Sequence, residues 1–233
     1  MHIVSILLLV IPLAIAPGVA IAFFIYFRDK FDKEPFKLIR NCFLFGMLSI
    51  LPAMTIEIAL SYTGINENGS AWKTLLYAIF VVGLAEEMSK FLFLRTYVYR
   101  KPDFNYPFDG IVYAIMISMG FATIENIMYA ANGGTQAALL RMFTAVPLHA
   151  VCAIFMGYYA GKAKFSKHKT ATLILGIIIA VVVHGLYDFF LFQQEIPYLA
   201  IFAFVTLGVS VGFSFIAINK LRKISAIPTE PEL

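Results

Sequence analysis

Two adjacent glutamates and a lysine interrupt an otherwise apolar stretch of the sequence. Glu86 and Glu87 are followed one helical turn later by Lys90. On a helix, Lys90 lies at i+4 from Glu86 and at i+3 from Glu87, so it can form an ion pair with one of them. An ion pair of this kind neutralises one carboxylate and leaves the second without a structural role. The pattern therefore indicates a chemical function.

Three further groups of ionisable residues occur in apolar stretches. Glu125, next to Asn126, has no lysine or arginine within a helical turn, so it must be protonated, paired with another helix, or bound to metal or water. His149 follows Pro147 in a later stretch. His184 and Asp188 are spaced i, i+4, which places the imidazole and the carboxylate on one helix face. An aspartate at this position can fix the tautomer of a histidine, or both groups can bind a metal.

The composition identifies the elements that carry these residues. Of 233 residues, 61% are hydrophobic and 14% are charged, whereas soluble domains carry about 25% charged residues. The apolar residues fall into runs of roughly 20, the length of a transmembrane helix. We therefore predict an all-α polytopic membrane protein, a bundle of about seven transmembrane helices. The predicted spans are Ile3–Phe27, Phe36–Tyr62, Ala71–Tyr99, Phe108–Ala131, Ala138–Gly161, Ala171–Phe192 and Pro197–Asn219.

Basic residues cluster in every second connection between these runs. They occur in the segments 28–40, 95–101 and 162–169 and after the last run, at 220–223, whereas 63–70, 132–136 and 193–196 contain none. The positive-inside rule then predicts an extracytoplasmic N-terminus and a cytoplasmic C-terminus in a cell membrane. The rule also accounts for the net charge of +4, and without a basic and aromatic groove motif we expect no nucleic-acid partner.

The polar groups are predicted to converge at one depth. At about 1.5 Å per residue, the glutamate pair and the two histidines lie roughly 18–20 Å from the cytoplasmic side. Glu125 and Asp188 lie about 25 Å from it. Polar residues without a common role would be scattered in depth, so this agreement predicts a single site at or just outside the middle of the membrane. Asp109, after Pro107, is expected to serve the N-terminus of its helix instead.

Such a site suits the hydrolysis of an amide. One of Glu86 and Glu87 would act as general base on a water molecule, with His149 and His184 donating to the developing oxyanion. Alternatively, Glu125, His149, His184 and Asp188 would hold Zn²⁺, since histidine and carboxylate ligands with an open position form hydrolase sites. The H-E-x-x-H motif is absent, and the spacing decides neither the cofactor nor the base.

These motifs carry a family resemblance. Glu86-Glu87-x-x-Lys90, Phe121-x-x-x-Glu125 and His184-x-x-x-Asp188, with His149 between the last two, resemble the PrsW family of bacterial intramembrane proteases. That family is a branch of the group that contains the type II CAAX-prenyl proteases. The wider group tends to have an arginine after the glutamate pair, a histidine at the position of Glu125 and an asparagine at that of Asp188. The differences argue against a prenylated substrate.

The length predicts a single transmembrane domain over residues 1–223, and the composition of residues 224–233 predicts a disordered cytoplasmic tail. The resemblance implies that this domain is a protease. It implies cleavage of a single-pass anti-sigma factor on its extracytoplasmic side, within membrane lipid. Glu86 or Glu87 would be the base, with His149 and His184 around the water or the oxyanion. Lys90, Glu125, Asn126 and Asp188 would be supporting groups.

Two other classes of function compete with this interpretation. A non-catalytic membrane scaffold can keep histidines for packing, but the intact glutamate pair argues against it. A proton-coupled transporter can relay protons through glutamate, histidine and aspartate. Duplicated halves would favour a transporter, and the sequence contains no internal repeat.

Overall fold

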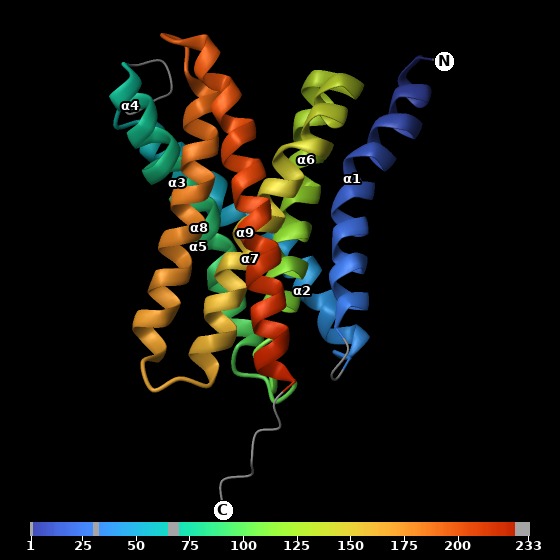
Figure 1. Ribbon diagram of the computed structural model, residues 1–233. Coiled ribbons are helices and arrows are strands. Elements are labelled where there is room, and N and C mark those ends of the chain that lie inside the picture. The colour runs from blue at the N-terminus through green and yellow to red at the C-terminus, as the bar shows by residue number, and fades with distance from the viewer. Residues whose placement is uncertain (1, 30–32, 65–69, 227–233) are drawn as a thin grey trace, which may run out of the picture.

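The protein is a bundle of helices, most of which run roughly between two opposite ends (Figure 1). The computed structural model describes residues 2–29, 33–64 and 70–226, and these ranges contain helices and no strands. The start of α1 (His2–Arg28) and the connection between α8 (Lys169–Phe192) and α9 (Ile201–Ser225) lie at one end. The end of α1, the connection between α7 (Ala145–Lys164) and α8, and the end of α9 lie at the other. Most of the tail predicted at 224–233 lies outside the described residues, and α9 ends at Ser225.

The first three apolar stretches form the front half of the chain. The first is α1 (His2–Arg28), and the second is divided at Ser49 into α2 (Phe36–Leu48) and α3 (Ile50–Ser61). The third is segmented: α4 (Ala71–Leu76), the π-helical turn η1 (Tyr77–Gly83), α5 (Leu84–Phe93) and a second π-helical turn, η2 (Leu94–Val98). The glutamate pair thus lies on a short α-helix between two π-helical turns, which are frequent at functional sites.

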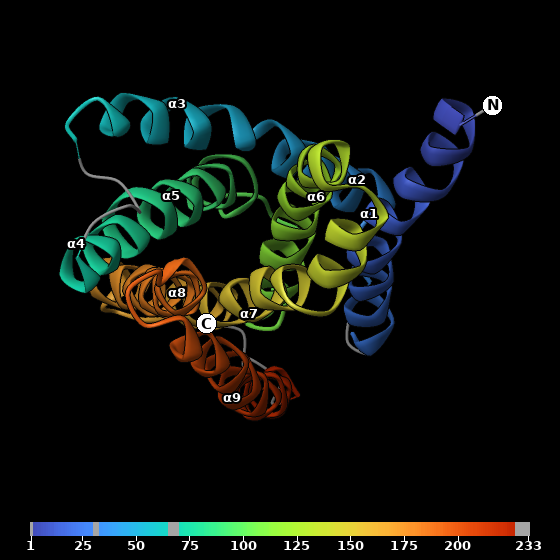
Figure 2. The ribbon, with the colours of Figure 1, turned by 90° about the horizontal axis from the view of Figure 1, so that it is seen from above.

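The second half contains the longest helices. Helix α6 (Asp109–Phe143) is interrupted at Gly134, whose φ of 63° reverses the chain so that residues 135–143 return toward the bundle. It is followed by α7 (Ala145–Lys164), α8 (Lys169–Phe192), the 3₁₀ turn η3 (Pro197–Ala200) and α9 (Ile201–Ser225). In Figure 2, the first part of α6 is surrounded by α1, α2 and α7. Its residues 109–123 are all buried, so this segment forms the centre of the core.

Length and composition identify five helical segments that are able to cross a membrane. They are Val10–Arg28, Phe36–Ser61, Asp109–Lys164, Lys169–Phe192 and Pro197–Ser225. The predicted count of about seven is therefore not confirmed. The difference has two sources: residues 109–164 count as one segment of 56 residues despite the break at Gly134, and the segment 71–98 is not among the five. The segment 71–98 is broken into short helices and carries several charges.

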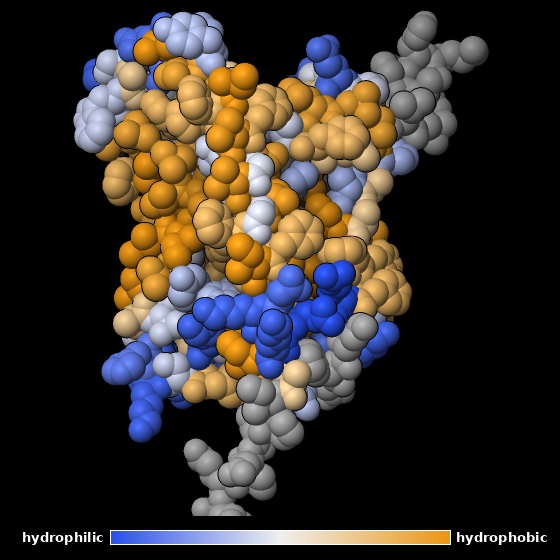
Figure 3. All heavy atoms as spheres, in the orientation of Figure 1, coloured by the Kyte–Doolittle hydropathy of each residue, from blue (hydrophilic) through white to orange (hydrophobic). Residues whose placement is uncertain are grey.

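The surface agrees with a membrane environment. Large apolar side chains are exposed around the middle of the bundle, and hydrophilic residues gather toward the ends (Figure 3). Phe204 and Phe213 on α9 are 52% and 59% exposed. Lipid would cover such a belt, whereas a soluble monomer rarely exposes so large an apolar area.

Candidate functional site

Close packing of α8 against η1 brings the glutamate pair to His184. A methyl group on Gly185 would lie only 2.7 Å from the Cα of Ile79, so a glycine is required at this contact. Gly83 makes the reciprocal approach, with a methyl group 3.1 Å from the carbonyl oxygen of Val181. Gly83 lies one helical turn before Glu86, and Gly185 directly follows His184. The two glycines therefore allow the backbones of η1 and α8 to approach closely beside the polar side chains.

Lys90 contacts both glutamates, whereas the sequence had suggested an ion pair with only one of them. Its Nζ lies 3.1 Å from Glu86 Oε2 and 2.8 Å from Glu87 Oε1. The same ammonium lies 3.0 Å from His149 Nδ1 and 4.1 Å from the ring centre of Phe121. The lysine side chain is only 2% exposed. Charge-assisted hydrogen bonds to three groups compensate for its burial.

His184 lies between three carboxylates. Its Nδ1 is 2.8 Å from Glu87 Oε1, and its Nε2 is 3.3 Å from Asp188 Oδ2 and 3.8 Å from Glu86 Oε2. The i, i+4 pairing of His184 with Asp188 is therefore present, as the spacing predicted. If Nδ1 carries the proton and donates it to Glu87, Nε2 presents a lone pair on the opposite side, which is the usual arrangement of an oriented histidine.

His149 joins a fourth carboxylate, Glu125, to the cluster. Its Nε2 lies 2.7 Å from Glu125 Oε2, and its ring packs edge-on against that of His184 with centres 5.1 Å apart. Glu125 is paired with another part of the chain, one of the alternatives left open by the sequence. The partner is Arg141, whose Nη2 lies 2.6 Å from the same oxygen. The turn at Gly134 returns Arg141 to Glu125, since the two residues lie on opposite sides of it.

Asn126 supports this pair from behind. Its side-chain oxygen accepts a hydrogen bond of 3.0 Å from Arg141 Nε, and its nitrogen donates one of 3.1 Å to the carbonyl oxygen of Ala14 on α1. Asn126 is fully buried. It therefore ties the Arg141 segment to two helices. All eight of the residues singled out from the sequence belong to one connected set of contacts: Glu86, Glu87, Lys90, Glu125, Asn126, His149, His184 and Asp188.

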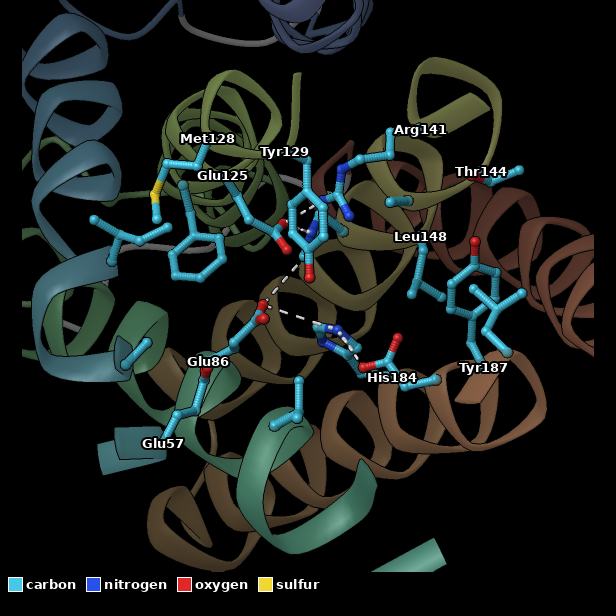
Figure 4. A pocket seen from close by; sticks show the side chains of 18 of the residues that line it. Glu57, Glu86, Glu125, Met128, Tyr129, Arg141, Thr144, Leu148, His184 and Tyr187 are labelled. Atoms are coloured by element: carbon cyan, nitrogen blue, oxygen red, sulfur yellow. Dashed lines mark hydrogen bonds and ion pairs between the residues drawn. The ribbon is translucent and has the colours of Figure 1, made fainter. Parts of the chain in front are cut away.

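A cavity of about 540 Å³ opens onto this cluster. Figure 4 shows Glu86, Glu125 and His184 pointing into the same space from three different helices. His149 and Asp188 also line the cavity, whereas Glu87 and Lys90 do not. The glutamates therefore differ in position: Glu86 faces the cavity, and Glu87 lies behind it against Lys90 and His184.

Among the residues of the cavity wall that were not singled out from the sequence, three bear on the site: Glu57, Tyr129 and Arg141. Arg141 pairs with Glu125 and stacks on Tyr129, with its Cζ 4.0 Å from the ring centre. Glu57 enters the cavity from α3. Arg141 and Glu57 are ionisable residues within predicted apolar runs, so the rule that identified Glu125 would also have found them. Tyr129 carries no comparable signal, because a tyrosine in a membrane helix is common at its ends.

The donor atoms of the site suit a divalent metal ion. Glu86, Glu87, His149 and His184 each offer a ligand atom, and these atoms lie within 4.8 Å of one another. Glu87 Oε2 is buried and has no hydrogen-bond partner among the described residues. The set differs from the one predicted, since the glutamate pair replaces Glu125 and Asp188. Glu125 is not available as a ligand because it is paired with Arg141. A bound ion would have to displace the Lys90 ammonium, which lies within 3.1 Å of three of the four groups.

A second group of acids lies at the other end of α6. Asp29, Glu34 and Asp109 are buried, with carboxylate oxygens within 4.8 Å of one another. Asp109 accepts hydrogen bonds from the backbone N–H groups of Asn105 and Tyr106, just before its helix begins. It lies in the first turn of α6, as the sequence predicted. We refer to these three residues as the inner acidic group and to the polar residues around the cavity as the carboxylate–histidine cluster.

Comparison with known proteins points to one family of membrane proteases. A family described as PrsW family intramembrane metalloprotease matches residues 34–217. The chain is 34% identical to Protease PrsW of Shouchella clausii over 91% of its own length and 95% of that protein. It is 35% identical to Protease PrsW of Bacillus subtilis (78% and 82% covered) and 38% identical to that of Oceanobacillus iheyensis (79% and 84% covered). No solved structure matches the chain.

Proposed function

Because this chain belongs to the PrsW family and is an intramembrane protease, we propose that it cleaves a single-pass membrane regulator of the anti-sigma-factor kind near the outer membrane face. The observation that carries the proposal is the shared cavity, into which Glu86, His149 and His184 project. A carboxylate and two histidines around one space can activate water and stabilise the charge that develops on a peptide carbonyl.

Glu86 is the proposed general base, and Glu87 is the group that orients His184. The support is their difference in position: Glu86 lines the cavity, whereas Glu87 is fully buried and bonded to Lys90 and His184. Only a carboxylate that reaches the cavity can take a proton from a water molecule placed beside the substrate. Glu87 instead holds Nδ1 of His184, so that Nε2 faces the cavity.

The reaction then proceeds by two proton transfers. The water oxygen attacks the peptide carbonyl carbon while Glu86 takes the water proton. With Nδ1–H held by Glu87 and a second proton on Nε2, His184 donates from Nε2 to the resulting oxyanion, and His149 lies beside it. When the C–N bond breaks, Glu86 returns the proton to the departing amine. Glu125 and Arg141 keep His149 in place through the contact at Nε2.

A metal ion is part of the proposal. Zn²⁺ would be held by residues from the set Glu86, Glu87, His149 and His184, which includes nitrogen and oxygen donors of the kinds found in zinc hydrolases. When bound, such an ion lowers the pKa of its water ligand and polarises a carbonyl group.

The proposed topology has seven crossings, with the N-terminus outside and the C-terminus in the cytoplasm. Two observations support it: the chain reverses at Gly134 within the segment 109–164, and the basic residues between α7 and α8 lie at the same end as the end of α9. In this orientation, the carboxylate–histidine cluster lies toward the outer half of the membrane. The cut would then fall near the outer boundary of a substrate helix.

The test is an assay in which the purified full-length protein and a single-pass anti-sigma factor are placed in the same lipid bilayer and cleavage is measured. We expect Glu86→Gln to lower the rate by a factor of about 10²–10⁴, the usual contribution of a general base. Glu87→Gln should lower it by roughly 10–100-fold, as for groups that orient a functional histidine. Glu34→Gln is the matched control, since it replaces a buried glutamate outside the site. Undiminished cleavage by folded Glu86→Gln would refute the assignment.

A further inference from the structure

Glu57 has an unusual position for a carboxylate on a peripheral helix. The hydroxyl groups of the other polar residues of α3 bond to their own helix, Thr55 to the carbonyl of Leu51 and Ser61 to that of Ile58. Glu57 instead lines the cavity, as Glu86 does (Figure 4). Neighbouring side chains of α3, such as Ile56 and Ile58, are exposed on its outer surface. The helix thus presents one charged group to the cavity.

The charges around the cavity leave Glu57 without a basic partner. Glu125 pairs with Arg141, Glu86 with Lys90, and Asp188 with His184. Arg141 is the one lysine or arginine among the described residues that line the cavity, and Glu125 already holds it. No lysine or arginine of the described chain forms an ion pair with Glu57. A metal ion would leave this unchanged, because Glu57 is not part of the donor set.

We propose that Glu57 is a specificity-determining residue that receives a lysine or arginine side chain of the substrate next to the cleaved bond. The inference rests on the proposed function and adds a requirement to it. A carboxylate in a largely apolar cavity attracts a cation strongly, because little solvent screens the interaction. A cationic side chain from the substrate would supply the missing partner, and an acidic one would be repelled by the carboxylates already there.

The position of Glu57 along α3 indicates where this basic residue lies in the substrate. It precedes Ser61, the last residue of the helix, by four residues, or roughly 6 Å. In the proposed orientation, that end of α3 is extracytoplasmic. Lysine and arginine near the end of a transmembrane helix extend their long side chains toward the interface. The selected residue would therefore lie in the outermost turns of the substrate helix.

The experiment uses a synthetic single-pass peptide with an apolar segment of about 20 residues. Its outer turns carry lysine, glutamine or glutamate at one scanned position. Cleavage and equilibrium binding are both measured with the full-length protein in lipid nanodiscs. We expect wild type to favour the lysine peptide over the glutamine peptide by roughly 10–100-fold, the range for a hydrogen bond between charged groups. Glu57→Gln should remove the preference, and Glu57→Lys should shift it toward the glutamate peptide.

Thr55→Val is the matched control on the same helix, because Thr55 is exposed and bonds only to its own backbone. It should keep the lysine preference of wild type. A Glu57→Gln variant that retains the preference, or that loses activity equally on all three peptides, would overturn the inference. Equal binding and equal cleavage of the three peptides by wild type would also overturn it. A Glu57-dependent lysine preference in binding without any cleavage would uphold the inference and count against the proposed function.

Discussion

The two ends of α6 accommodate buried carboxylates in opposite ways. In the carboxylate–histidine cluster, every acid except Glu57 is matched with a cation or a histidine, as Glu87 is with Lys90 and Glu125 with Arg141. The inner acidic group brings three acids together, and the phenol of Tyr113 donates a hydrogen bond to Glu34. Burial, together with the negative charge of Asp109, raises the pKa of Glu34 to about 10.

The comparison shows that burial of a carboxylate does not by itself identify a reaction site. A glutamate with a pKa of about 10 is protonated at neutral pH, so Glu34 acts there as a neutral hydrogen-bonding group. A carboxylate paired with lysine keeps its charge and its capacity to accept a proton. The pairing with cations, together with an adjoining cavity, distinguishes the reactive end of α6 from the structural one.

Metal removal should separate the two groups most sharply. We expect extensive chelation to reduce cleavage at least about 100-fold, and added Zn²⁺ to restore it, because the ion would polarise the carbonyl and the attacking water. Chelation should not affect the inner acidic group, since protonated acids need no ion. Elemental analysis alongside the cleavage assay gives the readout. Full activity in protein shown to contain no metal would assign water activation to Glu86 alone.

Loss of Arg141 should destabilise the cavity end of the bundle. The side chains of Arg141 and Glu125 are 15% and 13% exposed, so Arg141→Met would leave a mostly buried carboxylate without its cation. Removing one partner of a buried pair costs about 3–5 kcal/mol. Thermal unfolding in detergent would measure the loss. The double variant Arg141→Met/Glu125→Gln should recover part of it, and a double variant no more stable than Arg141→Met would contradict the pairing.

The inner acidic group should make the stability of the protein depend on pH. The pKa of Glu34 is about 4.5 in the unfolded chain and about 10 in the folded one, so the folded state binds its proton more tightly. Its contribution to stability is therefore complete below pH 4.5 and declines as the pH rises toward 10. Glu34→Gln should show a flatter fall of the unfolding temperature over this range. A curve with the slope of wild type would indicate that Glu34 is ionised in the folded protein.

Much of the site could be predicted because its residues violate the rule for their surroundings. Charged side chains in apolar helices are costly, so Glu86, Glu87, Glu125 and Asp188 were conspicuous in the sequence. Depth along each helix then predicted that they share one layer, because helix geometry fixes the rise per residue. The structure brings their side chains into contact.

Other features depended on contacts that no local pattern encodes. The pairing of Glu125 with Arg141 results from the reversal at Gly134, and a two-glycine sequence predicts a turn without fixing its direction. The contact of Lys90 with His149 requires α5 and α7 to be placed together. The number of crossings was also difficult to predict, because the segment that carries the glutamate pair is both broken by π-helical turns and rich in charge.

That segment has a consequence for biogenesis. A nascent helix that carries Glu86, Glu87 and Lys90 partitions poorly from the translocon into lipid, since each charge at its centre costs about 2.5–3.5 kcal/mol. Pairing within α5 reduces the cost, but the remaining partners, His149 and His184, are synthesised later. We expect this segment to leave the translocon fully only after α7 and α8 have followed it. In a ribosome-bound fragment that ends before α7, the segment 71–98 would then not yet be stably inserted in the membrane. Proteolytic activity would begin only after α8 has been synthesised.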